Sequence, residues 1–367
     1  MEYISENVTD YFNHSTTRIR GFSSMAVTIK DVAKAAGVSV ASVSRALNGS
    51  GSVTEETRKL VLETVRALRY IPHSGARSLS TSRTNTIGVL LPDLYGEFFS
   101  ELIRGIDMAA RRRGLHLLVS SSHGDADEAG AALRSMSGRV DGLIVMSPHV
   151  DASFLAANLP GALPIVLLNT HDAGHACSSL TVDNYGGAAA MVQHLVEMGH
   201  RRIMMITGPD SNFEAEERLR GFSETLARLV PDANPTDITV LRGDFTEEAG
   251  YRAGHQLQAL KRLPDAVFAA NDMMAIGCMF ALGEAGLQVP RDVAVVGFDD
   301  IPTARFIAPP LTTVRVRMTD MGSRALECLA FQIENPEGTK TSVQVLQTEL
   351  VVRRSCGSPR VAGRERR

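Results

Sequence analysis

Apolar residues recur at two different spacings along this chain of 367 residues. From Thr86 onward, short runs rich in Val, Ile and Leu alternate with longer stretches of helical period. Near-continuous apolar runs are typical of parallel strands that are buried on both faces, with helices covering them. The runs are TIGVLLPD (86–93), LHLLVSS (115–121), GLIVMSP (142–148), PIVLLNT (164–170), SLTVDN (179–184), RIMMITGP (202–209), ITVLRGDF (238–245), AVFAAND (266–272), VAVVGFDD (293–300) and LTTVRVR (311–317).

These runs are too many for one open sheet of ordinary size. They fall into two sets on either side of Gly199 and His200, and His200 itself is expected to be structural. Polar residues gather at the carboxyl ends of the runs, where parallel sheets bind their ligands. We therefore expect an α/β core of two lobes, each a doubly wound parallel sheet, with a ligand cleft between them.

The chain ahead of Thr86 has a helical period instead. Thr28 precedes Asp31 by three residues, a start that resembles a capping box. Gly37 is expected to end this first helix, and Ser39 to cap a second helix that runs to about Leu47. A third helix is expected to start at Thr54, with Val61, Val65 and Leu68 as its buried stripe, and to end at 70–72, where a proline follows. Such a unit is a helix-turn-helix.

The second helix carries small and polar residues on its outer face. In a major groove, Arg45 could pair with guanine or phosphate, and Ser42 or Ser44 with phosphate or a base edge. Val40 and Ala41 suit contact with thymine methyl groups. The alternative is a helical hairpin that has no role in DNA binding.

Charge is divided unevenly along the chain. Residues 26–85 carry nine Lys/Arg against four Asp/Glu, a net charge of +5, whereas residues 86–367 carry 27 against 34, a net charge of −7. The whole chain has a net charge of −3, which hides this division. A basic head on an acidic body suggests an anionic partner for the head alone, and the alternative is a solvated surface without a partner.

Two segments, TIKDVAKAAGVSVASVSRALN (28–48) and VTEETRKLVLETVRALRYIPHSGARSL (53–79), resemble the DNA-binding head of the LacI/GalR family of transcription regulators. The resemblance extends over nearly the whole chain. It implies that Val40 and Ala41 choose the operator, that Arg45 reads a base, and that the chain crosses between the two lobes three times. The residues expected to contact DNA are Thr28, Ser39, Val40, Ala41, Ser42, Ser44, Arg45, Asn48, His73, Ala76, Arg77 and Leu79.

The segment HSGARSLS (73–80) is too short to hold a helix in water by itself, and Gly75 weakens it further. The resemblance implies that this hinge folds when two subunits sit on DNA. Leu79 then wedges into a minor-groove step, and Ala76 and Arg77 fit the same pattern. Gly75 departs from the bulkier residue that is often found at its position in the family. A plain interdomain linker is the alternative.

The body is expected to bind a small effector. Carboxylates and amides bind paired sugar hydroxyls, and aromatic rings cover sugar C–H surfaces. The resemblance implies contacts from Arg218, Asn271 and Asp299, with stacking by Phe245, and Asp93, Phe98 and Phe99 are further candidates. The strand-end aspartates have an alternative role as helix caps or turn formers. Asn212 stands where purine-binding members of the family carry a further arginine, which favours a sugar.

Other functional classes lack their motifs. The chain has no GxGxxG after the first strand and no GxSxG, so we expect no enzymatic activity and no cofactor. Its four cysteines have no metal-ligand spacing, and no apolar run is long enough to span a membrane. A solute-binding transport protein would need an export signal, and the first 24 residues are polar. A cytoplasmic, nucleoid-associated protein is therefore expected, with no membrane partner.

The expected organisation begins with a disordered extension at 1–25, where translation could instead start at Met25. A helix-turn-helix follows at 26–71, a hinge at 72–85, a core at 86–355 and a disordered tail at 356–367. The first lobe is expected to combine 86–199 with 314–343, and the second 200–313 with 344–355, the segment SVQVLQTELVVRR (342–354) returning to the lobes.

The tail SCGSPRVAGRERR (355–367) has no leucine heptads, so a homodimer is expected and not a tetramer. The expected function is that of a repressor that binds a near-palindromic DNA operator as a dimer and is released by a sugar-type effector. The same fold with the ligand as corepressor stays open.

Overall fold

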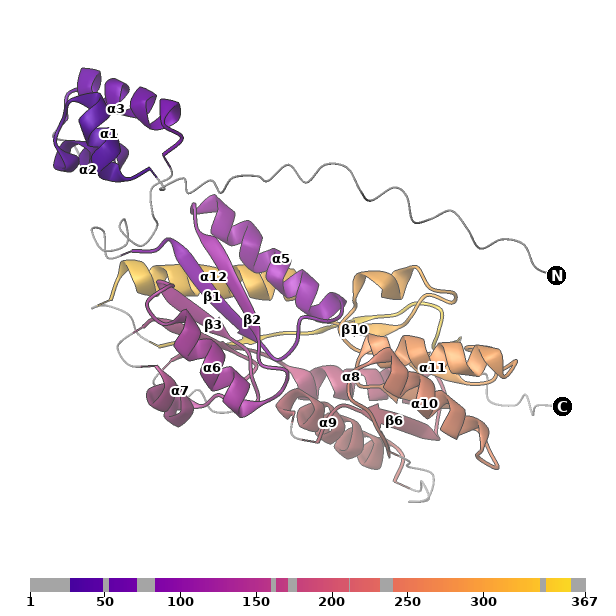
Figure 1. Ribbon diagram of the computed structural model, residues 1–367. Coiled ribbons are helices and arrows are strands. Elements are labelled where there is room, and N and C mark those ends of the chain that lie inside the picture. Colours follow the sequence, from indigo (N-terminus) through magenta and orange to yellow (C-terminus); the bar gives the residue numbers. More distant parts are fainter. Residues whose placement is uncertain are drawn as a thin grey trace, which may run out of the picture. The chain divides into compact units, whose positions relative to one another are not determined.

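The computed structural model consists of two compact units, Met1–Ser82 and Arg83–Arg367. Figure 1 shows the order of the elements within each unit. The residues that the structure describes are 27–48, 53–70, 83–159, 163–170, 177–210, 212–231, 240–336 and 341–357. Among these residues, no helix is both long and apolar enough to cross a lipid bilayer.

The first unit is a bundle of three short helices around a small apolar core (Figure 1). Val32, Val43 and Val61 contribute one fully buried side chain from each helix. Alanine side chains fill the rest of the contact between the first two helices, so these helices can pack closely. The predicted helix-turn-helix is thereby confirmed. Its helices are α1 (Ile29–Ala36), α2 (Val40–Asn48) and α3 (Glu55–Ala67).

Local hydrogen bonds define the starts of these helices, as the sequence predicts. The Asp31 carboxylate accepts the backbone N–H and the hydroxyl of Thr28 at 2.8 and 2.7 Å, and these bonds lower the pKa of Asp31. Gly37 ends α1 in the left-handed region, with φ 65°. The Ser39 hydroxyl accepts the backbone N–H of Ser42 at 3.1 Å and so caps α2.

The end of α3 differs from the prediction. The helix ends at Ala67 and not at the residues before Pro72, because Arg69 takes a left-handed φ of 49°. This turn lets the Tyr70 backbone N–H donate to the carbonyl of Val65 at 3.0 Å and buries the Tyr70 ring in the core. Tertiary packing therefore ends α3, ahead of any effect of the proline.

The first lobe of the second unit is built on a six-stranded parallel sheet of order β11-β5-β4-β3-β1-β2. One face packs against α5 and α12, and the opposite face packs against α6 and α7 (Figure 1). The strands are β1 (Thr86–Leu91), β2 (His116–Ser121), β3 (Gly142–Val145), β4 (Ile165–Leu168), β5 (Ser178–Val182) and β11 (Val343–Leu346), and the helices are α5 (Glu97–Arg112), α6 (Ala126–Met136), α7 (Ala152–Asn158) and α12 (Met318–Glu334).

The second lobe holds a four-stranded parallel sheet of order β7-β6-β8-β9. Its helices pack in pairs, α8 with α9 and α10 with α11. The predicted pair of doubly wound parallel sheets is thus confirmed. The elements of this lobe are β6 (Ile203–Thr207), β7 (Val240–Arg242), β8 (Ala266–Ala269), β9 (Ala294–Val296), α8 (Asn184–Glu197), α9 (Phe213–Leu229), α10 (Glu247–Gln258), α11 (Asp272–Glu284) and the 3-10 helix η3 (Pro302–Arg305).

The chain passes between the two lobes three times, as the resemblance implies. It leaves the first lobe between β5 and α8, returns between β10 (Thr313–Arg315) and α12, and leaves again between β11 and β12 (Glu349–Val351). Strands β10 and β12 pair with each other in antiparallel fashion, so the last two passages run side by side.

Two lobe boundaries differ from the expected ones. Helix α8 packs against α9, β10 and β12, so the first passage lies at 183–184 and not at 199–200. Strand β11 pairs with β5 through Leu346, which places residues 344–346 in the first lobe. In both cases the partner of an element, which lies far away in the sequence, decides the lobe to which the element belongs.

The expected disordered tail also begins too early. Cys356 is fully buried, its carbonyl oxygen lies 3.0 Å from Nε2 of His200, and its Sγ accepts the hydroxyl of Thr312 at 3.2 Å. His200 itself is buried, so its contact with this segment agrees with the structural role expected for it. Residues 358–367 lie outside the described part of the chain.

Candidate DNA-contacting and effector-binding sites

Helix α2 presents one face to solvent and the other to the core of the first unit. Val43 and Ala46 are buried, whereas Val40, Ala41 and Arg45 are exposed. The apolar Val40 side chain is 40% exposed although it stands at the start of a helix that has a core to pack against. An exposed stripe of this kind is available for contact with another molecule.

The hydroxyl groups around this face contribute to the caps. Thr28 and Ser39 are exposed, and their side chains are engaged by Asp31 and Ser42. Ser42 and Ser44 are half-buried beside the exposed stripe. Four residues expected to contact DNA lie outside the described residues: His73, Ala76, Arg77 and Leu79. For Asn48, the structure describes the backbone and not the side chain.

In the second unit, Arg218 of α9 is the centre of a buried polar cluster. Its Nε donates to Oδ1 of Asn184 at 2.8 Å, and its Nη1 donates to the carbonyl of Ala270 at 2.5 Å. The guanidinium also stacks on the ring of Phe298, 3.9 Å from the ring centroid. These contacts hold a cation that is only 4% exposed in one fixed orientation.

Asp299 follows β9 and lies beside this cation. Its Oδ1 is 3.3 Å from Nη1 of Arg218, within ion-pair distance, yet this oxygen accepts no hydrogen bond of good geometry. Burial raises the pKa of Asp299 to about 7, an effect that Arg218 opposes and Glu214 reinforces. A buried acceptor without a donor is costly, so this oxygen is ready to receive a donor from a ligand.

Asn271 and Phe245 join the same cluster from the ends of β8 and β7. Asn271 caps α11 by accepting the backbone N–H of Met274 at 2.9 Å, and its Nδ2 donates to the carbonyl of Phe245 at 2.8 Å. The half-buried Phe245 ring lies 5.9 Å from the Arg218 guanidinium. Four of the predicted effector residues are therefore brought together: Arg218, Phe245, Asn271 and Asp299.

The other three predicted effector residues make contacts of their own, away from Arg218. The exposed Asp93 carboxylate accepts the backbone N–H groups of Leu94 and Tyr95 at 2.6 and 3.0 Å, which makes it a turn former. Phe98 and Phe99 form an edge-to-face pair with a centroid separation of 5.2 Å and pack on the apolar core. No described contact joins any of the three to the Arg218 cluster.

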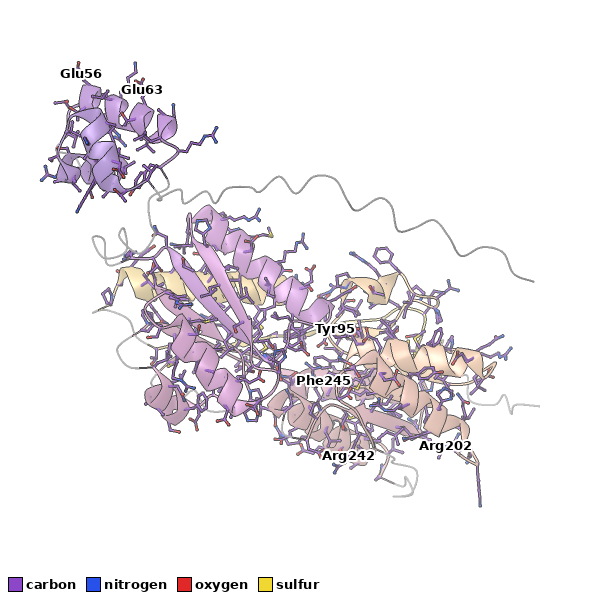
Figure 2. All side chains as sticks on the ribbon, viewed as in Figure 1. Glu56, Glu63, Tyr95, Arg202, Arg242 and Phe245 are labelled. Carbon is purple, nitrogen blue, oxygen red and sulfur yellow. The ribbon has the colours of Figure 1, made fainter. Side chains whose placement is uncertain are left out.

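The turn that Asp93 forms lies where the two lobes meet. The Tyr95 hydroxyl donates to Oε2 of Glu247 at 3.3 Å, and Figure 2 labels Tyr95 and Phe245 near the place where the two lobes meet. Glu97 at the start of α5 accepts the backbone N–H of Thr303 at 2.9 Å. The predicted residues of the first lobe therefore border the lobe junction.

Two residues of the cluster were missed by the sequence analysis. Nδ2 of Asn169, at the end of β4, donates to Oε1 of Glu214 in the first turn of α9 at 2.5 Å, which joins the two lobes. Asn169 is 8% exposed, and its Oδ1 has no hydrogen-bond partner. Asn169 is a polar residue near the end of the run PIVLLNT, as Asn271 is near the end of AVFAAND, whereas nothing in the sequence pairs Asn169 with Glu214.

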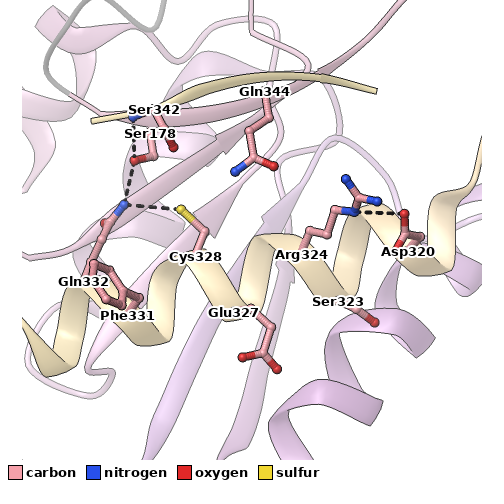
Figure 3. Close-up of a pocket in the computed structure, with 10 residues that line it drawn as sticks. All are labelled: Ser178, Asp320, Ser323, Arg324, Glu327, Cys328, Phe331, Gln332, Ser342 and Gln344. Carbon is pink, nitrogen blue, oxygen red and sulfur yellow. Dashed lines mark hydrogen bonds and ion pairs between the residues drawn. The ribbon is translucent and has the colours of Figure 1, made fainter. Parts of the chain in front are cut away.

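A separate cavity of about 560 Å³ lies on the first lobe. Figure 3 shows it beside α12, with residues of β5 and β11 on its other side. Gln332 donates to Oγ of Ser178 at 2.9 Å along its wall, and Arg324 pairs with Asp320 at 2.9 Å. None of the predicted effector residues lines this cavity, so it is distinct from the Arg218 cluster.

Comparison with known proteins agrees with both units. Residues 28–73 match the model of the bacterial regulatory proteins of the lacI family, and residues 192–356 match a periplasmic binding protein-like domain. The chain is 34% identical to the HTH-type transcriptional repressor PurR of Pasteurella multocida (strain Pm70) over 334 residues, which cover 90% of this chain and 99% of that protein.

Solved structures give the same result. The lac repressor dimer bound to operator and the anti-inducer ONPF is 31% identical, with a TM-score of 0.80, and the match covers 91% of this chain and all of that one. The transcriptional regulator CelR in complex with cellobiose is 32% identical, with a TM-score of 0.64, and the match covers 90% of this chain and 99% of that one. The chain therefore belongs to the LacI family of bacterial regulatory proteins.

Proposed function

We propose that this protein is a cytoplasmic transcriptional repressor that binds a near-palindromic operator as a dimer and is released from it by a small sugar-type effector. The observation that carries the proposal is the presence, in one chain, of an exposed Arg45 helix face and a buried polar cluster around Arg218. The relatives bear the name of repressors, and no catalytic role is proposed.

Several features of the cluster support a sugar over other small ligands. It combines carboxylate, amide and guanidinium groups with the Phe245 ring, which suits hydroxyls and a C–H surface. Asn212 caps α9 by accepting the backbone N–H of Ala215 at 2.9 Å, so this position supplies an amide and not a second cation. Among the similar structures, CelR holds cellobiose.

The crossing strands supply a route from the effector to the DNA. Asp300, next to Asp299, pairs with Arg315 of β10 at 2.7 Å and with Arg353 beyond β12 at 2.5 Å. An effector that contacts Asp299 therefore acts next to the second and third passages of the chain between the lobes. In this mechanism, closure of the lobes on the effector shifts the first lobe, so that the two hinges of a dimer no longer pair. The coupling is reciprocal, and operator binding weakens effector binding by the same factor.

Selection of DNA from a random duplex pool, followed by titration of the selected site with mono- and disaccharides, tests the proposal. We expect a palindromic site from which one sugar releases the protein. Arg45→Ala should weaken binding to that site by about 1–3 kcal/mol, whereas Arg252→Ala, in the second unit, should not. Tighter binding with the sugar would make the ligand a corepressor, and failure to select any DNA would contradict the proposal.

A further inference from the structure

Two buried acceptors in the Arg218 cluster lack a hydrogen-bond donor. They are Oδ1 of Asp299 and Oδ1 of Asn169, and both residues are more than nine-tenths buried. They belong to different lobes and are linked through α9, because Glu214 accepts a hydrogen bond from Asn169 and also raises the pKa of Asp299. Buried acceptors in native proteins normally have a donor, so these two oxygens are places where a ligand can donate hydrogen bonds.

The charges of the cluster point to the kind of ligand. Arg218 forms an ion pair with Asp299, and Glu214 and the buried Asp272 each add a carboxyl group that interacts with Asp299. The neighbouring Asp300 is neutralised separately, by Arg315 and Arg353. An anionic ligand would therefore lie beside the Glu214 carboxylate, and at low dielectric two neighbouring negative charges repel each other strongly.

The first turn of α9 leaves little attraction for an anion. The N-cap position holds the amide of Asn212, and the Glu214 carboxylate lies in the first turn, where the helix dipole favours a negative group. Glu214 and Arg218 are four residues apart on one helix, so both face the junction from α9. The protein's own carboxylate thus takes the place that a phosphate would otherwise find favourable.

We propose that Glu214 is a specificity-determining residue of the effector site, which makes the site select uncharged ligands rich in hydroxyl donors and reject anionic ones such as sugar phosphates. The inference rests on the proposed function, because it assigns the ligand class of the same site. One ligand hydroxyl can replace Asn169 as the donor to Glu214, and other hydroxyls can donate to the two unpartnered acceptors. A phosphate monoester offers mainly acceptors and negative charge.

Matched pairs of neutral and phosphorylated sugars test this selectivity. Glucose is compared with glucose 6-phosphate, and ribose with ribose 5-phosphate. Binding is measured as the shift that each sugar causes in the unfolding midpoint of the native protein and of the variants Glu214→Gln and Glu216→Gln. Glu216 is the control, because it is an exposed glutamate in the same helical turn. We expect the neutral sugar to bind the native protein. The Glu214→Gln variant should bind this sugar about tenfold to hundredfold more weakly, and the ratio of its affinities for the neutral and the phosphorylated sugar should be smaller.

Each outcome decides one of the two proposals. A phosphorylated sugar that binds the native protein as well as its neutral partner overturns the inference and leaves the sugar-type effector standing. Equal behaviour of Glu214→Gln and Glu216→Gln overturns it as well. If neither sugar and neither phosphate binds, glucose and ribose are excluded as effectors, and the inference is then decided by a second measurement that needs no ligand.

The second measurement follows the Asp299 carboxyl group by carbon NMR during a pH titration. We expect the titration to move to lower pH in Glu214→Gln and to stay in place in Glu216→Gln, because Glu214, unlike Glu216, raises the pKa of Asp299 through its charge. An unmoved titration in both variants means that Glu214 does not face the site, and the inference falls. Binding of inorganic phosphate at this cluster, seen as a changed Asp299 signal in the native protein, overturns it too.

Discussion

At the scale of single residues, the Arg218 cluster is marked by unusual backbone conformations. Among the described residues, seven non-glycine residues have a positive φ, and four of them lie in or beside the cluster. Such a conformation costs energy in an ordinary side-chain-bearing residue, and it persists where the surrounding structure requires it. Here the strained backbone places polar groups at the ends of strands. The four residues are Asn169, Phe245, Asp299 and Asp300.

The pKa of Asp299 gives a prediction for the stability of the protein. Burial raises this pKa to about 7, whereas the pKa of an aspartate in an unfolded chain is about 3.9. Between these values the folded protein binds more protons than the unfolded chain, so the free energy of unfolding falls as the pH rises from about 4 to 7. We expect Asp299→Asn to reduce this slope. Asp272, whose pKa is also raised by burial, contributes part of what remains.

Unfolding by denaturant at a series of pH values measures the slope. Asp127→Asn is the control, because Asp127 is exposed on α6. If Asp299→Asn keeps the full slope of the native protein, Asp299 does not take up a proton in the folded state.

At the scale of elements, glycine sets the distance between α5 and α12. A Cβ atom at Gly105 would lie 2.1 Å from the carbonyl oxygen of Thr319, and one at Gly322 would lie 2.3 Å from the carbonyl oxygen of Leu102. Both obstacles are backbone atoms, which a side-chain rotation cannot move away. The sequence predicts each of these helices, and the two glycines explain how closely the helices pack.

We expect Gly105→Ala to destabilise the protein by roughly 1–3 kcal/mol, because the helices must separate to make room for the methyl group. Gly283→Ala is the matched control. Gly283 lies in α11 with open space around its Cβ position, so alanine should stabilise that helix by up to about 1 kcal/mol. Chemical denaturation of the two variants should therefore give changes of opposite sign. Equal stability of both would show that α5 and α12 can move apart freely.

At the scale of the whole molecule, the three passages of the chain between the lobes connect the Arg218 cluster with the first lobe. The network around Asp300 ties two of these passages together, since Arg315 and Arg317 both donate to Glu349 at 3.2 Å. A relative motion of the lobes must therefore bend β10 and β12 jointly. In the proposed mechanism, this joint bending is how one small ligand would change the arrangement of a much larger unit.

A dimer is the assembly that this architecture needs in order to bind a near-palindromic operator. We expect light scattering to give twice the chain mass of 39.5 kDa. A stable mass of four chains, or of one, would contradict the prediction.

The sequence by itself determined the local features and the class of the molecule. Caps such as Thr28 and Ser39, the left-handed Gly37 and ten of the strands depend on hydrogen bonds and periodicity within a few residues, so they could be predicted without a structure. The family resemblance added Arg218, Asn271 and Asp299, and the structure brings all three together.

Only the tertiary structure decided which distant residues meet. Asn169 and Glu214 are 45 positions apart, and Cys356 lies 162 positions from His194, whose ring nitrogen approaches its sulfur to 3.4 Å. The order of the strands and the three passages between the lobes create these contacts. Local periodicity carries no information about either, because it reports which face of an element is buried and not which element covers it.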